Sequence, residues 1–273
     1  NKVMCLRRNT SVSLFDAVVE KNIEWLNNED SDWKQKLAIF APEVLIHCAW
    51  NGVRGTDRNN LKVQLKNVEF SKKLFEAYPY KPIISLGSQA EYGFYDSIVT
   101  EDYPLKPVNN YGLAKVHVLD ELKTYAEARN IDWQWIRIFT VFGEKQNAGL
   151  IYCFTQKCLN EDKAFDTTSG MQEYSYLYSL DFAKAIMQVV GQRGKSGIYN
   201  LSQNLEIYSN IDILERIKAI LHSNINIKYG IIPYSQNQIM LMDGCTRKFV
   251  ESFGAIPQSD FWFALNNTVN SYR

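Results

Sequence analysis

The chain has 273 residues, of which 46% are apolar and 22% are charged, a profile typical of a globular protein with a substantial core. Lys and Arg together number 30, as do Asp and Glu, so there is no basic field to bind a nucleic-acid backbone. No apolar run of about 18 residues predicts a membrane span. Neither nucleic acid nor a membrane is therefore an expected partner.

Short apolar runs alternate with amphipathic stretches through the first half of the chain. Strands are predicted at residues 3–6, 23–28, 43–50, 81–87 and 132–143, and helices at 32–41, 59–78 and 109–130. The near-continuous apolar run at 43–50 is typical of a strand buried on both faces. The alternation predicts an α/β fold, a doubly wound parallel sheet with helices on both faces.

The character of the chain changes after Gly143. Residues 144–180 are mixed and rich in aromatic side chains. A helix beginning near 180, a strand at 196–202 and helices at 211–221 and 260–273 are predicted beyond them. Because no Pro-, Gly- or Ser-rich linker divides the two halves, the second half is expected to be a smaller lobe and not a separately linked domain.

The cysteines and histidines indicate neither a disulfide framework nor a metal site. The five cysteines include no CxxC pair, and the three histidines lie far apart in sequence. The chain also starts without a signal-peptide pattern. Reduced, mostly buried thiols fit a cytoplasmic protein, and we expect that localisation and no bound metal.

Several polar side chains lie at or just beyond the ends of predicted strands. They are His47, Ser88, Tyr111 and Arg137. In doubly wound sheets, ligands bind outside the carboxyl ends of the strands. The pattern therefore predicts that these four residues line one crevice.

Tyr111 and Lys115 lie four residues apart on the helix predicted at 109–130, so their side chains share one face. An ammonium beside a phenol favours the phenolate and lowers the tyrosine pKa from its usual value of about 10. Tyr111 is thus a candidate general acid or base, and Ser88 a candidate donor to the same substrate oxygen. A tyrosine and a lysine at this spacing also occur by chance on solvated helices.

Motifs spread over the chain together resemble the extended short-chain dehydrogenases/reductases, also called the NAD-dependent epimerase/dehydratase family. The stretch "IISLGSQAEYG" at 83–93 is similar to the fifth strand of that family, and "YGLAK" at 111–115 fits its YxxxK motif. "EVLIHCAW" at 43–50 resembles its "DxVIHxAA" strand, and Asn67 its helix-four asparagine. "WIRIFTVFG" at 135–143, "GIYNLS" at 197–202 and "TRKFVESFGAIP" at 246–257 resemble its later segments.

The resemblance implies a Rossmann-like dinucleotide-binding domain over residues 1–143. It implies a mainly substrate-binding lobe over 144–273, with the segment near 180–202 returning to the first domain. The usual substrates of the family are nucleotide-diphosphate sugars, and the helices at 59–78 and 109–130 often form its homodimer interface. In this chain the implied catalytic residues are Ser88, Tyr111 and Lys115. Tyr111 would exchange a proton with a sugar hydroxyl or ketone while hydride passes between that carbon and a nicotinamide.

Further residues are implied for the two ligands. The cofactor-binding set is Arg7, Arg8, His47, Cys48, Ala49, Asn67, Tyr111 and Lys115, and the substrate-binding set is Ser88, Gln89 and Thr140. Arginine after the second strand of the family suits a 2′-phosphate, whereas a carboxylate there would bind the ribose hydroxyls. Arg7 and Arg8 therefore favour NADP over NAD as the cofactor.

The chain departs from the family at its start. In the family, a first strand and a glycine-rich turn precede the segment that corresponds to residues 1–8, and this sequence does not contain them. That turn brings backbone amides to the cofactor pyrophosphate. By analogy with a βα unit, we expect about 25 further residues upstream. The alternative is a short protein that has lost cofactor binding.

Other departures concern the reaction and the substrate. Gln89 and Ala90 stand where the sugar 4,6-dehydratases of the family have Asp and Glu, so dehydratase activity is not expected. Thr140 replaces a substrate-contacting asparagine, and Tyr174 lies near the position of a phosphate-pairing arginine. We expect an NAD(P)-dependent reductase or epimerase of a nucleotide-diphosphate 4-keto sugar. The alternatives are a non-catalytic dinucleotide-binding relative and a reductase of a non-sugar carbonyl.

Overall fold

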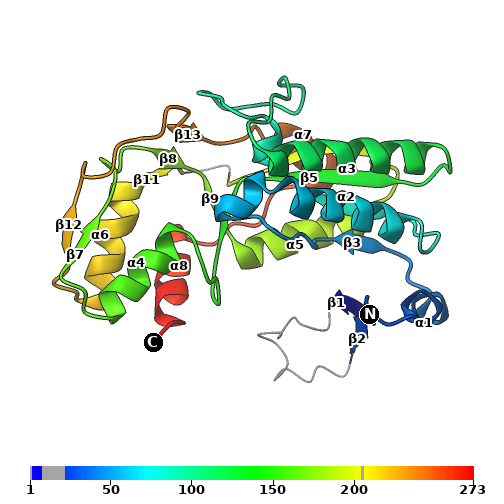
Figure 1. Cartoon of the computed structure of the whole chain (residues 1–273), viewed down its shortest axis with the longest axis horizontal. Helices are drawn as coiled ribbons and strands as arrows, with labels where there is room; N and C mark the ends of the chain where they lie inside the picture. The colour runs from blue at the N-terminus through cyan, green and yellow to red at the C-terminus, as the bar shows by residue number, and fades with distance from the viewer. Residues whose placement is uncertain (1, 8–21, 204–205) are drawn as a thin grey trace.

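A four-stranded parallel sheet forms the centre of the larger part of the protein (Figure 1). The computed structural model describes residues 2–7, 22–203 and 206–273. Across the sheet the strands follow the order β10 (Gly197–Leu201), β5 (Trp133–Ile138), β4 (Ile83–Ser88) and β3 (Leu45–His47). Neighbouring strands all pair in parallel. The Rossmann-like α/β fold expected from the alternating pattern is confirmed.

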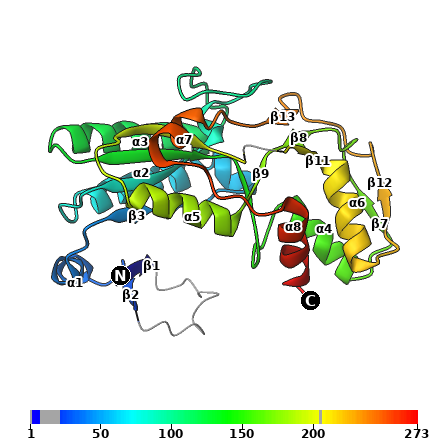
Figure 2. The ribbon, with the colours of Figure 1, turned by 180° about the vertical axis from the view of Figure 1, so that it is seen from behind.

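Helices cover both faces of this sheet. Helices α2 (Leu61–Phe75) and α3 (Asn110–Glu127) lie on one face, and α5 (Ser179–Val190) and α7 (Arg247–Phe253) on the other (Figure 2). Successive side chains of a strand point to opposite faces. In β4, Ile83 accordingly packs with α2 and α3, whereas Ile84 packs with α5 and α7.

Strand β3 differs from the expectation that residues 43–50 form a strand buried on both faces. It spans only Leu45–His47, and Ile46 is 40% exposed. Among the described residues β3 pairs with β4 alone, so it is an edge strand, and an edge strand exposes part of its apolar surface. Strands β1 (Val3–Arg7) and β2 (Ile23–Asn27) form a separate parallel pair, followed by α1 (Trp33–Phe40).

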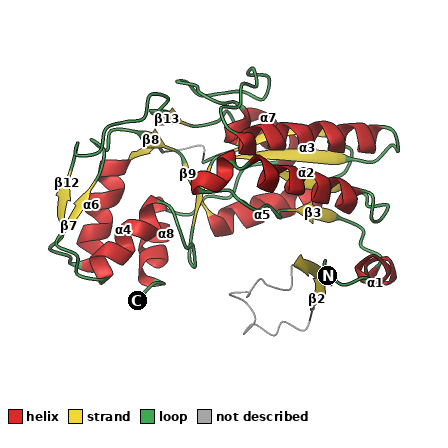
Figure 3. Cartoon of the chain, viewed as in Figure 1, coloured by secondary structure: helices red, strands yellow, loops and turns green. Residues whose placement is uncertain are grey.

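A second hydrophobic cluster holds the C-terminal lobe together. It joins α4 (Leu150–Leu159), α6 (Asn210–Leu221) and α8 (Phe261–Asn270), which lie beside the short strands β7 (Ala164–Asp166) and β12 (Asn226–Lys228) (Figure 3). The other short elements are β6 (Thr140–Phe142), β8 (Glu173–Tyr174), β9 (Tyr176–Tyr178), β11 (Tyr208–Ser209) and β13 (Leu241–Met242), and the 3₁₀ turns η1 (Gly55–Asn59) and η2 (Gln89–Glu91).

The chain passes more than once between the main sheet and the C-terminal lobe. After β9, helix α5 packs against the main sheet and β10 joins it as an edge strand, and the chain then returns to the lobe. The division at residue 143 into a cofactor domain and a substrate lobe stays a prediction, since it assigns a ligand to each part. The homodimer interface on α2 and α3 also stays a prediction. In the described part of the chain, no helix has the length and apolar character needed to cross a membrane.

Candidate active site

The end of β4 and the start of α3 bring the candidate catalytic residues together. Strand β4 ends at Ser88, and Tyr111 lies in the first turn of α3. Asn109 caps this helix, because its side-chain oxygen accepts a hydrogen bond from the Gly112 backbone amide at 2.9 Å. The cap fixes the first turn of α3 and with it the direction of the Tyr111 side chain.

Gly112 allows α3 to approach the turn after β4 very closely. A Cβ atom at this position would lie only 2.4 Å from the carbonyl oxygen of Ala90. The close approach places the Tyr111 side chain beside Ser88, and both residues are buried. Burial raises the pKa of Tyr111, and a hydrogen bond with the Ser88 side chain lowers it.

The Ser88 hydroxyl is oriented by a capping box. Its Oγ accepts a hydrogen bond from the Ala90 backbone amide at 3.2 Å, and the Glu91 carboxylate accepts one from the Ser88 backbone amide at 2.7 Å. Because Oγ acts as an acceptor toward the backbone, its hydrogen is directed elsewhere. Ser88 can therefore donate to an oxygen that approaches from the side of Tyr111.

Lys115 is buried on the same face of α3 as Tyr111. Its ammonium donates to the Leu86 carbonyl oxygen at 2.6 Å and lies 3.7 Å from the centroid of the Trp50 ring. Burial lowers the pKa of Lys115 to about 7, although the negative charge of Glu91 raises it. The distance from its Nζ to the centroid of the Tyr111 ring is 6.0 Å.

The expected effect of Lys115 on Tyr111 differs from what the structure shows. Helical spacing predicts that the ammonium lowers the pKa of the Tyr111 phenol, whereas burial keeps this pKa above its usual value. The physical reason is the direction of the Lys115 side chain, which is bound to Leu86 and Trp50. The two residues share a helix face, but the ammonium donates its hydrogen bond to the Leu86 carbonyl oxygen.

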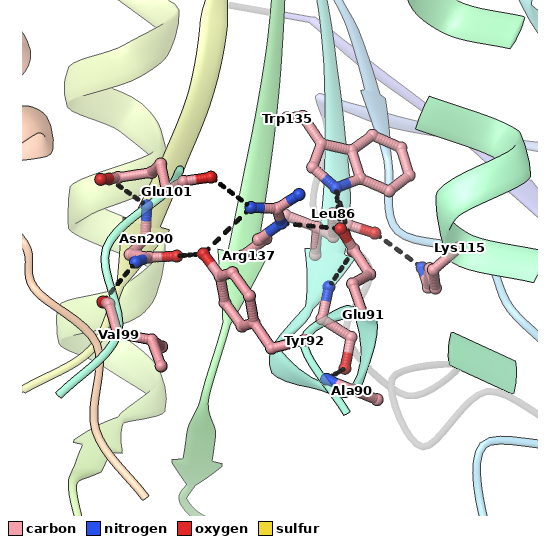
Figure 4. A network of polar contacts seen from close by, with 11 residues as sticks. Leu86, Ala90, Glu91, Tyr92, Val99, Glu101, Lys115, Trp135, Arg137 and Asn200 are labelled. Atoms are coloured by element: carbon pink, nitrogen blue, oxygen red, sulfur yellow. Dashed lines mark hydrogen bonds and ion pairs between the residues drawn. The ribbon is translucent and has the colours of Figure 1, made fainter. Parts of the chain in front are cut away.

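A buried ion pair supports the turn that carries Ser88 (Figure 4). Arg137 Nε donates to Glu91 at 2.7 Å, and the indole of Trp135 donates to the same carboxylate at 3.0 Å. Glu91 and Arg137 are 0% and 1% exposed. A second guanidinium nitrogen of Arg137 donates to the Tyr92 hydroxyl and to the Glu101 carbonyl oxygen, each at 3.0 Å. The turn after β4 is thus fixed to β5.

The network continues from Tyr92 into β10. The Tyr92 hydroxyl donates to the Asn200 side-chain oxygen at 2.6 Å, and the Asn200 amide nitrogen donates to the Val99 carbonyl at 3.0 Å (Figure 4). Glu91 had no assigned role in the sequence-based prediction. The signal that would have found it is the pattern Ser-x-x-Glu from Ser88 to Glu91, which is a capping-box signature.

Three of the residues expected on the cofactor side, His47, Cys48 and Ala49, lie at the end of β3 or directly after it. The ring of His47 is buried, with Nδ1 at 2.9 Å from Ser85 Oγ and Nε2 at 3.3 Å from Ser71 Oγ. Burial lowers the pKa of His47 to about 3, so the ring is neutral. Its side chain belongs to the core, whereas Cys48 and Ala49 beyond it are exposed.

Asn67 fixes the loop that follows β3. Its side-chain amide donates to the Asn51 carbonyl at 2.8 Å and accepts from the Asn51 backbone amide at 2.9 Å. Arg7 ends β1, in the separate pair of strands, with its guanidinium 4.7 Å from the centroid of the Trp25 ring. The predicted cofactor residue Arg8 lies outside the described residues.

The two further substrate candidates occupy different surroundings. Gln89 directly follows Ser88, and its side-chain oxygen accepts a hydrogen bond from the Tyr95 hydroxyl at 3.2 Å. The hydroxyl of Thr140, in β6, donates to the Met242 sulfur at 3.4 Å. Gln89 is thus adjacent to the Ser88–Tyr111 pair, whereas Thr140 contacts a C-terminal segment.

Comparison with curated proteins shows similarity to enzymes named for nucleotide sugars. CDP-abequose synthase from Salmonella muenchen is 24% identical over 231 residues, which cover 82% of this chain and 75% of that protein. The dTDP-4-dehydro-6-deoxyglucose reductase of Escherichia coli is 28% identical over 219 residues, covering 73% of this chain and 69% of that protein. Other relatives are named dTDP-6-deoxy-L-talose 4-dehydrogenase and UDP-glucose 4-epimerase.

Solved structures show the same fold at low identity. The UDP-N-acetylglucosamine 4-epimerase from Methanobrevibacter ruminantium M1, solved with UDP-N-acetylmuramic acid, has a TM-score of 0.87 at 23% identity, covering 100% of this chain and 90% of that chain. MoeE5 in complex with UDP-glucuronic acid and NAD has a TM-score of 0.80 at 16% identity, covering 92% and 86%. Residues 1–202, most of the chain, match the NAD dependent epimerase/dehydratase family itself. The family indicated by the motifs is confirmed, and the chain belongs to the NAD dependent epimerase/dehydratase family.

Proposed function

We propose that the protein is an NAD(P)-dependent reductase or epimerase of a nucleotide-diphosphate 4-keto sugar, in which Tyr111 is the general acid or base. The observation that supports this most strongly is the placement of Ser88, Tyr111 and Lys115. All three side chains are buried, the Ser88 side chain lowers the pKa of Tyr111, and Lys115 lies one turn further along α3. A relative without catalytic activity would have no chemical need for this group.

The end of β3 fits the nicotinamide half of a dinucleotide. Cys48 and Ala49 are exposed at the carboxyl end of a parallel strand, where doubly wound sheets bind such cofactors. The Lys115 ammonium has three donors, of which one binds Leu86, so it can also hold a ribose hydroxyl. A bound nicotinamide would supply the site for hydride transfer.

The protein side of the reaction is the movement of one proton. In the oxidising direction the phenolic oxygen of Tyr111 takes the proton of a sugar hydroxyl, and in the reducing direction it returns the proton to the ketone oxygen. Ser88 donates a hydrogen bond to that same oxygen and holds it in line with Tyr111. Gln89 and Ala90 carry no titratable group, which supports reduction or epimerisation over water elimination.

A substrate screen tests the proposed function. The protein is incubated with dTDP-4-dehydro-6-deoxyglucose and NADPH or NADH, and separately with UDP-glucose and NAD. We expect coenzyme oxidation in the first assay if it is a reductase and a new sugar isomer in the second if it is an epimerase. Turnover of only non-sugar ketones, or cofactor binding without any turnover, would contradict the proposal.

Arg7→Asp is expected to shift the cofactor preference from NADP toward NAD. Arg7 ends a strand that pairs in parallel, the position from which side chains reach the adenosine ribose. A carboxylate would repel a 2′-phosphate and accept hydrogen bonds from the ribose hydroxyls. Since a hydrogen bond to a charged group contributes about 1.5–3 kcal/mol, the ratio of the two dissociation constants should change at least about tenfold. Fluorescence titration with both cofactors measures it, and an unchanged ratio would remove the argument for NADP.

A further inference from the structure

Tyr111 has a second cationic neighbour, which comes from outside its own helix. Arg58 lies in the 3₁₀ turn η1 between β3 and α2. Its guanidinium carbon is 4.7 Å from the centroid of the Tyr111 ring, whereas the ammonium of Lys115 is 6.0 Å from that centroid. The guanidinium therefore lies closer to the candidate acid–base ring than the lysine of the YxxxK motif does.

A hydrogen bond fixes η1 to the helix that carries Tyr111. The side chain of Asn110, directly before Tyr111, donates to the carbonyl oxygen of Asn59, directly after Arg58, at 2.7 Å. One residue thus joins the two chain segments at the point where the guanidinium and the phenol ring meet.

A buried glutamine holds the other end of the same loop. Gln64 is 1% exposed, and its side-chain nitrogen donates to the carbonyl oxygens of Gly52 at 2.8 Å and Asp57 at 2.9 Å. Its oxygen accepts a hydrogen bond from the Trp50 indole at 2.9 Å. The position of Arg58 therefore results from a fixed loop and not from the side chain alone.

Among the described residues, three charged groups from separate elements or turns lie near Tyr111 or act on its pKa. Arg58 comes from η1, Glu91 from η2, and Lys115 from the next turn of α3. The charge of Arg58 lowers the pKa of Tyr111 and that of Glu91 raises it, while burial raises it most. Lys115 is itself bound to the Leu86 carbonyl. Among these groups, Arg58 is the cation that favours a negative charge on the phenol.

We propose that Arg58 is a positioning residue that acts through Tyr111, stabilising its phenolate while the proton is exchanged with the substrate. The proposal rests on the proposed function of Tyr111. The proton passes only between the substrate oxygen and the phenolic oxygen, because a guanidinium stays protonated in proteins. The role proposed for Arg58 thus concerns this proton transfer alone and adds no further chemistry of the cofactor.

A titration of Tyr111 tests the proposal without requiring turnover. Ring-carbon NMR of labelled tyrosine follows each phenol separately, and the Tyr111 signal is identified by its loss in Tyr111→Phe. We expect Arg58→Gln to raise the midpoint of this signal by about one pH unit, the lower end of the usual effect of a close opposite charge, because Arg58 is half-buried. Arg58→Lys should restore most of the shift.

Arg54 provides a matched control on the same loop. It is an exposed arginine whose guanidinium donates to the Asn147 side chain at 2.8 Å, so Arg54→Gln should leave the Tyr111 midpoint unchanged. An unchanged midpoint in Arg58→Gln, or an equal shift in Arg54→Gln, would overturn the proposal. If the screen finds no sugar-nucleotide turnover, the proposed function fails, but this titration still decides the role of Arg58.

The rate profile gives the second readout. In the direction that oxidises the sugar hydroxyl, the rate rises with pH as Tyr111 loses its proton, and Arg58→Gln should move this rise upward by about one pH unit. Activity at neutral pH then falls about tenfold and recovers at higher pH. A raised KM with an unchanged profile would show that Arg58 binds the substrate instead.

Discussion

Tyr111→Phe is expected to reduce turnover by about a thousandfold, because it removes the one oxygen proposed to carry the proton. The aromatic ring remains, so the edge contact with Trp50 and the contact with the Arg58 guanidinium are kept. The fold and the cofactor affinity should consequently change little. Steady-state rates together with a cofactor titration measure the two effects separately.

Tyr125→Phe is the matched control for this substitution. Tyr125 lies on the same helix, and its ring also contacts a guanidinium, that of Arg129 at 4.1 Å. Loss of this phenol should leave the rate unchanged. Wild-type turnover in Tyr111→Phe would refute the assignment of the general acid or base.

Glu91→Ala is expected to destabilise the protein by about 3–5 kcal/mol, because it leaves the guanidinium of Arg137 buried without its carboxylate. The substitution also removes the acceptor for the Ser88 backbone amide and the Trp135 indole. The double variant Glu91→Met with Arg137→Met should recover part of the loss, since no unpaired charge remains in it. Denaturant unfolding measures the free energy of unfolding of each variant.

An exposed ion pair of the same length serves as the reference. Lys73 donates to Glu69 at 2.7 Å, as Arg137 does to Glu91, but both side chains of this pair are more than half exposed. Glu69→Ala should change the free energy of unfolding by at most about 1 kcal/mol, because solvent screens the pair. Equal losses at the two pairs would show that burial does not determine the importance of Glu91.

The sequence predicts elements well where one periodicity extends over many residues. Residues 109–130 were expected to be helical, and α3 spans Asn110–Glu127 with an asparagine cap. Helix α4 was not predicted, because it follows Gly149 without a side-chain cap and mixes aromatic and polar residues. Its position in the second core depends on α6 and α8, which follow much later in the chain.

Burial and side-chain direction were harder to predict than the elements. The apolar run at 43–50 looks central, but the pairing of β3 decides that Ile46 is partly exposed. The spacing of Tyr111 and Lys115 fixes a shared helix face, whereas the Leu86 carbonyl on β4 decides where the ammonium points. The contact of Arg58 with Tyr111 joins segments far apart in sequence, so no local pattern reveals it.

The Glu91 carboxylate accepts hydrogen bonds from its own turn and from the neighbouring strand β5. This limits which segments can be exchanged between this protein and its relatives. Grafting the segment from Ser88 to Glu91 onto another scaffold would import a charge whose partners, Trp135 and Arg137, belong to the neighbouring strand. A chimera made at this loop must therefore carry β5 with it, or the recipient must already present both donors. The smallest transferable module that carries Ser88 is two adjacent strands and not one turn.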